Sequence, residues 1–363
     1  MIAGPLLLGA ALAAEPALDL SHSNVVASST LLAMGGAGVA MATGSGGISL
    51  NPASPGHRPA HRTAPVIWDL HGRIGRDGWY GSDVSNLGED EPWVSVTGSA
   101  GLSVSTPRFG AGLLVRGFSG RSLPERDRRM DFGDLRLAGA TRLGTSPLTV
   151  GAGLTLAAGW LKGAEAVDYA APGVSMGLIA DWADLGLHAA AVIETSQRDG
   201  NVPKSSGVQS VVVPARGAVG VAWASEVLPT PLDRHPLLLA ADLVVLAPVQ
   251  DGVVPEAWLE GVIRPRGETT TLSPRFGAEL EAVPDQLRLR AGAYLDPGRA
   301  QGANPRWHGT GGAELRTVKI RLRGESMYVS VRNGVDLAQR YVQVQLLGLS
   351  FWHPNRVAAS PPR

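Results

Sequence analysis

LTVGAGLTLAAGW, residues 148–160, alternates between apolar side chains and small ones. The apolar positions are Leu148, Val150, Ala152, Leu154, Leu156, Ala158 and Trp160, and the small ones are Thr149, Gly151, Gly153, Thr155, Ala157 and Gly159. A two-residue period is typical of a β-strand whose two faces meet different surroundings. The apolar face therefore needs a wide apolar surface to contact, and the opposite face has almost no bulk.

The same alternation recurs along the chain from residue 65 onward. Segments 272–282 and 287–295 place charged or small side chains between apolar ones. Further alternating segments are 94–104, 109–115, 135–143, 174–182 and 185–193. Turn residues such as Thr145-Ser146-Pro147 and Asp296-Pro297-Gly298 separate them. The pattern predicts an all-β chain of about 14 strands, mostly of roughly 10–13 residues.

Two architectures explain repeated strands with one apolar and one polar face. In a soluble antiparallel sandwich the apolar face forms the core, whereas in an outer-membrane barrel it contacts lipid and the polar face lines the lumen. Strands of about 9–11 residues suit a tilted bilayer crossing, while soluble strands average about 5–6. Tryptophans also fall at the predicted strand ends, where an interfacial ring is typical: Trp93, Trp160, Trp182, Trp223 and Trp352. These features favour the transmembrane antiparallel barrel, although aromatic residues are only 5% of the chain.

Composition excludes several functional classes. The 363 residues hold 32 basic and 32 acidic side chains, so the chain lacks the positive footprint of a nucleic-acid-binding protein. The absence of cysteine excludes disulfides, cysteine-ligated metals and a thiol nucleophile. No run of about 18 apolar residues is available for a membrane-spanning helix.

The first residues resemble an export signal. Residues 1–14 read MIAGPLLLGAALAA, and Ala11-Leu12-Ala13 supplies the small residues that a signal peptidase recognises. No basic residue precedes the apolar run, which leaves open a start farther upstream or a buried apolar helix. We expect residues 1–14 to be a signal peptide, which fits an outer-membrane destination.

Several segments together resemble the FadL/TodX family of outer-membrane transport proteins. The first is LAMGGAGVAMATGSGGISLNPASP at residues 32–55, which contains Asn51-Pro52-Ala53 near its end. The others follow in order: Pro214-Ala215-Arg216, Gly220-Val221-Ala222-Trp223, Ala240-Ala241-Asp242, residues 273–279 and residues 287–292. The resemblance implies a monomeric 14-stranded barrel that carries long-chain fatty acids or other hydrophobic small molecules.

The resemblance also implies an N-terminal plug at residues 15–60, followed by a barrel at 61–352 and a tail at 353–363. The plug motif would be Asn51, Pro52 and Ala53, together with Gly35, Gly36 and Gly38. Asn and Pro stiffen a turn, and glycines let a backbone approach the wall closely. A structural turn without a gating role is an equally good interpretation of this motif.

Charged side chains on the predicted strands are expected to point into the lumen. Placing them against lipid would cost about 2–4 kcal/mol each near the bilayer midplane. The predicted lumen-facing charges are Arg275, Glu279, Glu281, Arg288, Arg290 and Asp242, with Lys319, Arg321 and Arg323 behaving alike. Such charges most often brace the wall or hold a plug, and a polar pore for charged solutes is the alternative.

Enzyme and metal motifs are not supported. Gly44-Ser45-Gly46 lacks the outer glycines of a nucleophile elbow, and the glycine-rich stretches lack the Lys-Ser/Thr of a phosphate loop. His57 and His61 are four apart, but Pro59 between them argues against a shared helical face. We therefore expect no enzyme activity, no cofactor and no metal.

The predicted function is passive transport of hydrophobic small molecules across the outer membrane, with the lipid bilayer and the cargo as partners. The alternative is a barrel resembling the PorV-type subunits of type IX secretion, which bind exported proteins, or a structural barrel in a surface complex. The chain departs from the transporter family in two ways. Its last predicted strand ends at Phe351-Trp352, before a polar tail rather than at the C-terminus. The chain is also short, so we expect the long extracellular loops of the transporters to be reduced.

Overall fold

The computed structural model describes residues 16–21, 28–58, 65–77, 83, 86, 93–122, 128–163, 166–225, 236–284, 286–322 and 325–352. The predicted signal peptide and C-terminal tail lie outside the described residues, so both stay predictions.

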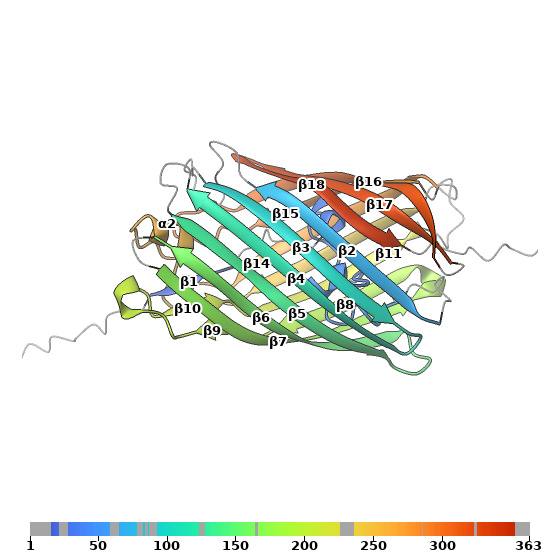
Figure 1. The fold of residues 1–363 in the computed structure, drawn as a ribbon, viewed down its shortest axis with the longest axis horizontal. Coiled ribbons are helices and arrows are strands. Elements are labelled where there is room, and N and C mark those ends of the chain that lie inside the picture. Colours follow the sequence, from blue (N-terminus) through green and yellow to red (C-terminus); the bar gives the residue numbers. More distant parts are fainter. Residues whose placement is uncertain are drawn as a thin grey trace, which may run out of the picture.

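Fourteen strands form a closed antiparallel barrel (Figure 1). They run in the order β11-β12-β14-β15-β16-β17-β18-β2-β3-β4-β5-β6-β7-β8, and β8 pairs with β11 to close the circle. Their bounds are β2 Ile67–Asp77, β3 Trp93–Ser105, β4 Phe109–Ser122, β5 Arg129–Arg142, β6 Leu148–Lys162, β7 Ala166–Trp182, β8 Leu187–Glu194, β11 Arg216–Ala224, β12 Leu237–Leu246, β14 Thr271–Val283, β15 Leu287–Asp296, β16 Arg306–Leu322, β17 Glu325–Ala338 and β18 Tyr341–Trp352. The all-β barrel predicted from the alternation is confirmed, although several strands are longer than predicted.

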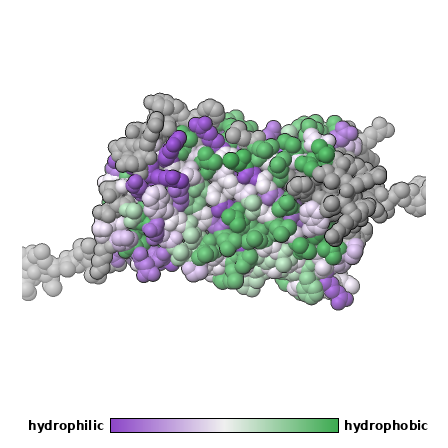
Figure 2. Space-filling model, in the orientation of Figure 1, coloured by the Kyte–Doolittle hydropathy of each residue, from purple (hydrophilic) through white to green (hydrophobic). Residues whose placement is uncertain are grey.

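The two faces of each strand meet different surroundings. In β6, Leu154 and Leu156 are exposed on the outer surface, whereas Thr155 and Ala157, which alternate with them, are buried inside. Phe276 of β14 and Ile193 of β8 are likewise exposed. On the face shown in Figure 2, hydrophobic residues cover the middle of the barrel wall, and hydrophilic ones gather mostly toward the end that carries β1 and β10. A closed barrel with an apolar outer band is the architecture of a strand-crossing membrane protein.

The two ends of the barrel differ in their connections. Residues 106–108, 143–147 and 183–186 form short turns at one end, which we call the turn end. The opposite end, which we call the loop end, carries the long connections 195–215 and 247–270. In bacterial outer-membrane barrels the short turns are periplasmic and the longer loops are extracellular.

A second sheet lies at the loop end and was not predicted. Its four strands run in the order β13-β1-β10-β9. They are β1 Ala17–Asp19, β9 Gln197–Asp199, β10 Ser210–Val213 and β13 Gly252–Val253. Because β1 pairs in parallel with both β10 and β13, the start of the described chain is held between the two long connections. We call these four strands the mouth sheet. Residues 17–19, which the sequence analysis assigned to the plug, thus form part of this sheet.

Residues 28–58, which we call the inner segment, touch inward-facing groups of strands all around the barrel. The segment contains α1 Ser29–Ala33 and the short 3-10 helix η1 Gly46–Ser49. Thr310 of β16 donates to the Ala33 carbonyl, and Asn51 donates to the Leu178 carbonyl of β7. The segment therefore crosses the interior between opposite walls. Its action as a plug stays a prediction.

The remaining helices belong to the connections. They are α2 Pro255–Leu259 and the 3-10 helices η2 Ala183–Leu185 and η3 Lys204–Ser206. Within the described part of the chain, none of the helices is long and apolar enough to cross a bilayer.

Candidate binding site in the barrel interior

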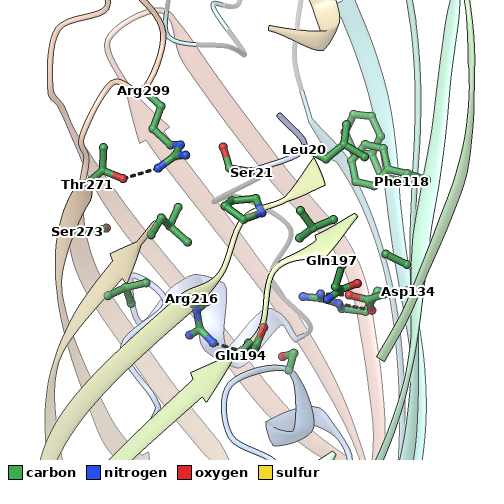
Figure 3. A pocket seen from close by; sticks show the side chains of 18 of the residues that line it. Leu20, Ser21, Phe118, Asp134, Glu194, Gln197, Arg216, Thr271, Ser273 and Arg299 are labelled. Carbon is green, nitrogen blue, oxygen red and sulfur yellow. Dashed lines mark hydrogen bonds and ion pairs between the residues drawn. The ribbon is translucent and has the colours of Figure 1, made fainter. Parts of the chain in front are cut away.

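A cavity of about 200 Å³ lies inside the barrel, between the mouth sheet and the inner segment. Leu20 and Ser21, directly after β1, border it (Figure 3), and so do Ser49 and Leu50 of the inner segment. The remaining lining residues come from β4–β8, β11, β12, β14, β15 and β18, from the two long connections and from the connection that follows β15. Two stretches of the N-terminal region thus help to enclose a space that the barrel strands alone would leave open.

One wall of the cavity is apolar. Phe118 of β4 and Phe132 of β5 stack with their ring centroids 4.5 Å apart. Leu20, Phe118 and Tyr169 belong to one buried hydrophobic cluster, which also includes Ala157 of β6. Stacked rings with a leucine and a small alanine offer a flat, dry surface that suits an apolar ligand.

A chain of alternating charges begins on the same two strands, β4 and β5, directly beside the stacked rings. Arg116 donates to both carboxylate oxygens of Asp134, and Arg136 donates to Asp134 over 3.1 Å. Arg136 also donates to Glu194 over 2.9 Å, and Arg216 donates to Glu194 over 3.2 Å. These pairs join β4, β5, β8 and β11, so they brace one side of the lumen as a single network.

Charged contacts also hold the mouth sheet over the cavity. Arg299 donates to Asp19 through two nitrogens, over 3.3 and 3.1 Å, and Arg266 donates to the Ser21 carbonyl over 3.0 Å. Burial raises the pKa of the Glu256 carboxyl in α2, while the nearby Arg266 acts in the opposite direction. Arg266 lies in the long connection 247–270 and Arg299 in the connection that follows β15, so the two arginines fix the N-terminal stretch to two connections at the loop end.

The predicted lumen charges lie on inward faces but form two separate groups. Arg290, Arg288, Glu279 and Glu281 share an ion-pair cluster on β14 and β15, in which Arg290 also donates to Glu314 of β16. This cluster is absent from the lining of the cavity as far as the described residues go, so it braces the wall elsewhere.

Asp242 and Arg275 form the second group, beside the inner segment. Asp242 accepts hydrogen bonds from the backbone N–H groups of Gly38 and Val39, over 2.7 and 2.9 Å. Arg275 lines the cavity, and its guanidinium lies 5.8 Å from the centroid of the Tyr294 ring. Asp242 therefore ties the inner segment to β12, and Arg275 is the predicted charge that reaches the cavity.

The residues of the predicted plug motif contact the barrel wall directly. Asn51 donates to the Leu178 carbonyl over 3.0 Å and caps its own turn by accepting from the Ala53 N–H. Gly35 has φ +63°, and a Cβ there would lie 2.7 Å from the backbone of Ala293. Pro52 lies in the same turn, against β6, and Gly36 and Gly38 lie beside Arg275 and Asp242.

Sequence reasoning missed that the wall also supplies glycine at these contacts. A Cβ on Gly177 of β7 would overlap Asn51 Oδ1. The face of small side chains in residues 148–160 could have indicated this close packing, because Gly151 on that face contacts Pro52 and Ala53.

Replacing Gly177 with alanine is expected to displace the Asn51 turn, at a cost of about 1–3 kcal/mol for overpacking. Faster amide hydrogen exchange across residues 44–57 would report the displacement. The matched control is Gly139→Ala on β5, where an added Cβ meets nothing within 4 Å. Equal exchange in both variants would contradict close packing between this turn and the wall.

Ser45, in the glycine-rich stretch, forms a tie to the wall rather than a catalytic arrangement. It is fully buried, donates to Asp69 and lies 2.9 Å from Nδ1 of His71. In a hydrolytic triad the histidine stands between the serine and the acid. Here both partners contact the hydroxyl itself, so the contacts attach the inner segment to β2.

The fold is that of known outer-membrane channels. A Pseudomonas aeruginosa FadL homologue matches with a TM-score of 0.56 and 13% identity, over 94% of this chain and 99% of that one. The CymD monoaromatic hydrocarbon channel matches with a TM-score of 0.56 and 15% sequence identity, over 92% of this chain and 100% of that one. The Ralstonia pickettii toluene transporter TbuX matches with a TM-score of 0.56 and 14% sequence identity, over 92% of this chain and 100% of that one. No protein-family model and no curated protein sequence matches. The chain thus has the FadL/TodX-type transporter fold that its sequence segments resemble.

Proposed function

We propose that this protein is an outer-membrane channel through which small hydrophobic molecules diffuse without energy input. The observation that carries the proposal is the enclosed cavity, with its stacked Phe118 and Phe132, between the mouth sheet and the inner segment. The apolar outer band supports a membrane location, and the FadL/TodX-type fold supports the outer membrane. With the loop end outside, cargo reaches the cavity from the cell exterior.

The size of the cavity favours cargo of one aromatic ring. A cavity of roughly 150 Å³ lined by apolar side chains is known to bind benzene, so about 200 Å³ suits a slightly larger molecule. Two of the structural neighbours are described as a toluene transporter and a monoaromatic hydrocarbon channel. Long-chain fatty acids, the example that the sequence suggested, are far longer than this space and would require the inner segment to move.

The proposed route runs past the inner segment toward the turn end. Ser49 and Leu50 close the cavity on this side, and Arg136 donates to the Ser49 carbonyl over 3.5 Å. That long hydrogen bond is weak compared with the two that hold Gly38 and Val39. The region around Ser49 is therefore the part of the inner segment that we expect to shift when cargo passes.

The alternative, a barrel that handles exported proteins, is disfavoured by the same cavity. A protein-binding barrel calls for a wide, charged, loop-covered mouth, whereas the cavity below the mouth sheet has a volume of only about 200 Å³. The apolar wall also contacts Leu20 of the N-terminal stretch, as expected for small apolar cargo.

Binding and uptake of radiolabelled toluene test the proposal directly. The full chain, expressed in a bacterial host with an outer membrane, is expected to raise toluene uptake at least severalfold over cells with an empty vector. The purified barrel should bind toluene saturably at one site, and folding is checked by its heat-modifiable migration on a gel. A folded barrel that neither binds toluene nor raises its uptake would overturn the proposal, and co-purification of one defined exported protein would favour the alternative.

A further inference from the structure

Two histidines and an aspartate converge where the inner segment meets the wall at the turn end. Asp181 of β7 and His188 of β8 are direct cross-strand partners beside the turn 183–186. Both lie on the inward face, as do the buried Ile179 and Ala190 next to them. His57, near the end of the inner segment, reaches the same point.

The three side chains are close enough to share one cation. Nε2 of His57 lies 3.7 Å from Oδ2 of Asp181, and Nδ1 of His188 lies 3.4 Å from Oδ1 of Asp181. All three ligand atoms lie within 4.8 Å of one another. Zinc bonds of about 2.0–2.1 Å in a tetrahedron place neighbouring ligand atoms roughly 3.3–3.4 Å apart, so small adjustments would complete the geometry.

The atoms that face the common point have no hydrogen-bond partners among the described residues. They are His57 Nε2, Asp181 Oδ1 and His188 Nδ1, and all three are buried. The His57 side chain is 5% exposed. Unpaired buried polar atoms are costly, so three of them around one point form an arrangement that a shared cation would satisfy.

The other nitrogen of His57 fixes its tautomer. Nδ1 lies 3.0 Å from the Ala42 carbonyl oxygen, which can only accept, so Nδ1 carries a hydrogen. In the neutral ring, Nε2 then directs its lone pair toward the Asp181 carboxylate, where a metal ion would sit. A histidine whose second nitrogen donates to a backbone carbonyl is the usual arrangement of a metal ligand.

A second buried histidine–aspartate pair in the barrel shows the contrast. His308 Nδ1 lies 2.9 Å from Asp336, and its Nε2 accepts from Arg306 over 3.2 Å. Both nitrogens of His308 are therefore satisfied without an ion. By contrast, Nε2 of His57 and Nδ1 of His188 have no hydrogen-bond partner among the described residues.

We propose that His57, Asp181 and His188 form a zinc site that fastens the inner segment to the barrel wall. Two imidazoles and one carboxylate are a common ligand set for Zn²⁺, with water in the fourth position, whereas Mg²⁺ and Ca²⁺ prefer oxygen ligands. The ion would link residue 57 to β7 and β8 at the periplasmic end. Zinc would thereby limit the motion of the inner segment.

The test uses the purified full chain, freed of metal with a chelator and titrated with ZnCl₂. We expect one Zn²⁺ per chain, and a loss of affinity of at least tenfold in Asp181→Asn and in His188→Gln. His308→Gln is the matched control and should bind zinc like the wild type. Binding that survives unchanged in both ligand variants, or no saturable binding by the folded wild type, would overturn the proposal.

Two measurements on the wild type do not depend on variants that could misfold. Co²⁺ in place of zinc should give the intense visible absorption of a tetrahedral site. Zinc should also slow amide exchange around residue 57, which a proton shared between His57 and Asp181 would not do. A weak octahedral cobalt spectrum together with unchanged exchange would contradict the site.

Discussion

Replacing Ala157 with phenylalanine is expected to lower toluene binding and uptake at least tenfold. Ala157 is buried, lies on the inward face of β6 and lines the cavity. The added ring is about the size of benzene, which fills a cavity of roughly 150 Å³, so it would occupy most of the available 200 Å³. Titration of labelled toluene into the purified variant, with uptake in parallel, measures the loss.

The next residue supplies the matched control. Ala158 carries the same side chain but is exposed on the outer face of β6, where a phenyl ring would meet lipid. Ala158→Phe should therefore bind toluene like the wild type, and both variants should keep heat-modifiable migration. If Ala157→Phe transports normally while folded, the cavity is not on the cargo route.

Removing the carboxylate of Glu314 is expected to destabilise the barrel by about 3–5 kcal/mol, the cost of breaking a buried ion pair by deleting one partner. The Glu314 side chain is 2% exposed. It accepts from Arg290 over 2.6 Å and from Arg332 over 3.2 Å. Glu314→Ala would leave both guanidinium groups short of a counter-charge, as unfolding by denaturant in lipid vesicles should show.

An ion pair near the rim is the comparison for Glu314. Asp131 pairs with Arg129 over 2.5 Å, but the Arg129 side chain is 53% exposed. Asp131→Ala should therefore cost no more than about 1 kcal/mol. If both substitutions cost equally little, water in the lumen screens the Glu314 cluster and the cluster does not brace the wall.

Much of the barrel wall could be predicted because a strand has a two-residue period. That period assigned Leu154 and Leu156 to the lipid and Ala157 to the interior, and it placed Arg275 and Asp242 on the lumen side. The ion-pair cluster on β14 and β15 was not predicted, but it joins strands that are neighbours in both sequence and space. Long strands were underestimated, because their ends beyond the apolar band lose the alternation.

The mouth sheet and the ligand groups could not be predicted in this way. Residues 17–19 pair with segments 210–213 and 252–253, and strands of two to four residues are too short to show a period. Arg136 and Glu194 meet although their strands are not neighbours in the barrel. The sequence compared His57 with His61, whereas the structure brings His57 to Asp181 and His188.

Taken by itself, the sequence determined that this protein is built of β-strands and, for the strands whose alternation it shows, which face is apolar and which is polar. Those properties depend on local alternation and on the cost of placing a charge in lipid, and both can be evaluated one strand at a time. The placement of Lys319, Arg321 and Arg323 in the lumen stays a prediction, because these side chains lie outside the part of the chain that the structure describes. Only the tertiary structure decided where the inner segment lies, which side chains meet across the lumen, and how Leu20, Phe118 and Ala157 enclose one cavity. These contacts join residues that are distant in the sequence, such as Leu20 and Ala157, and barrel closure together with the path of the inner segment sets them, rather than any local pattern.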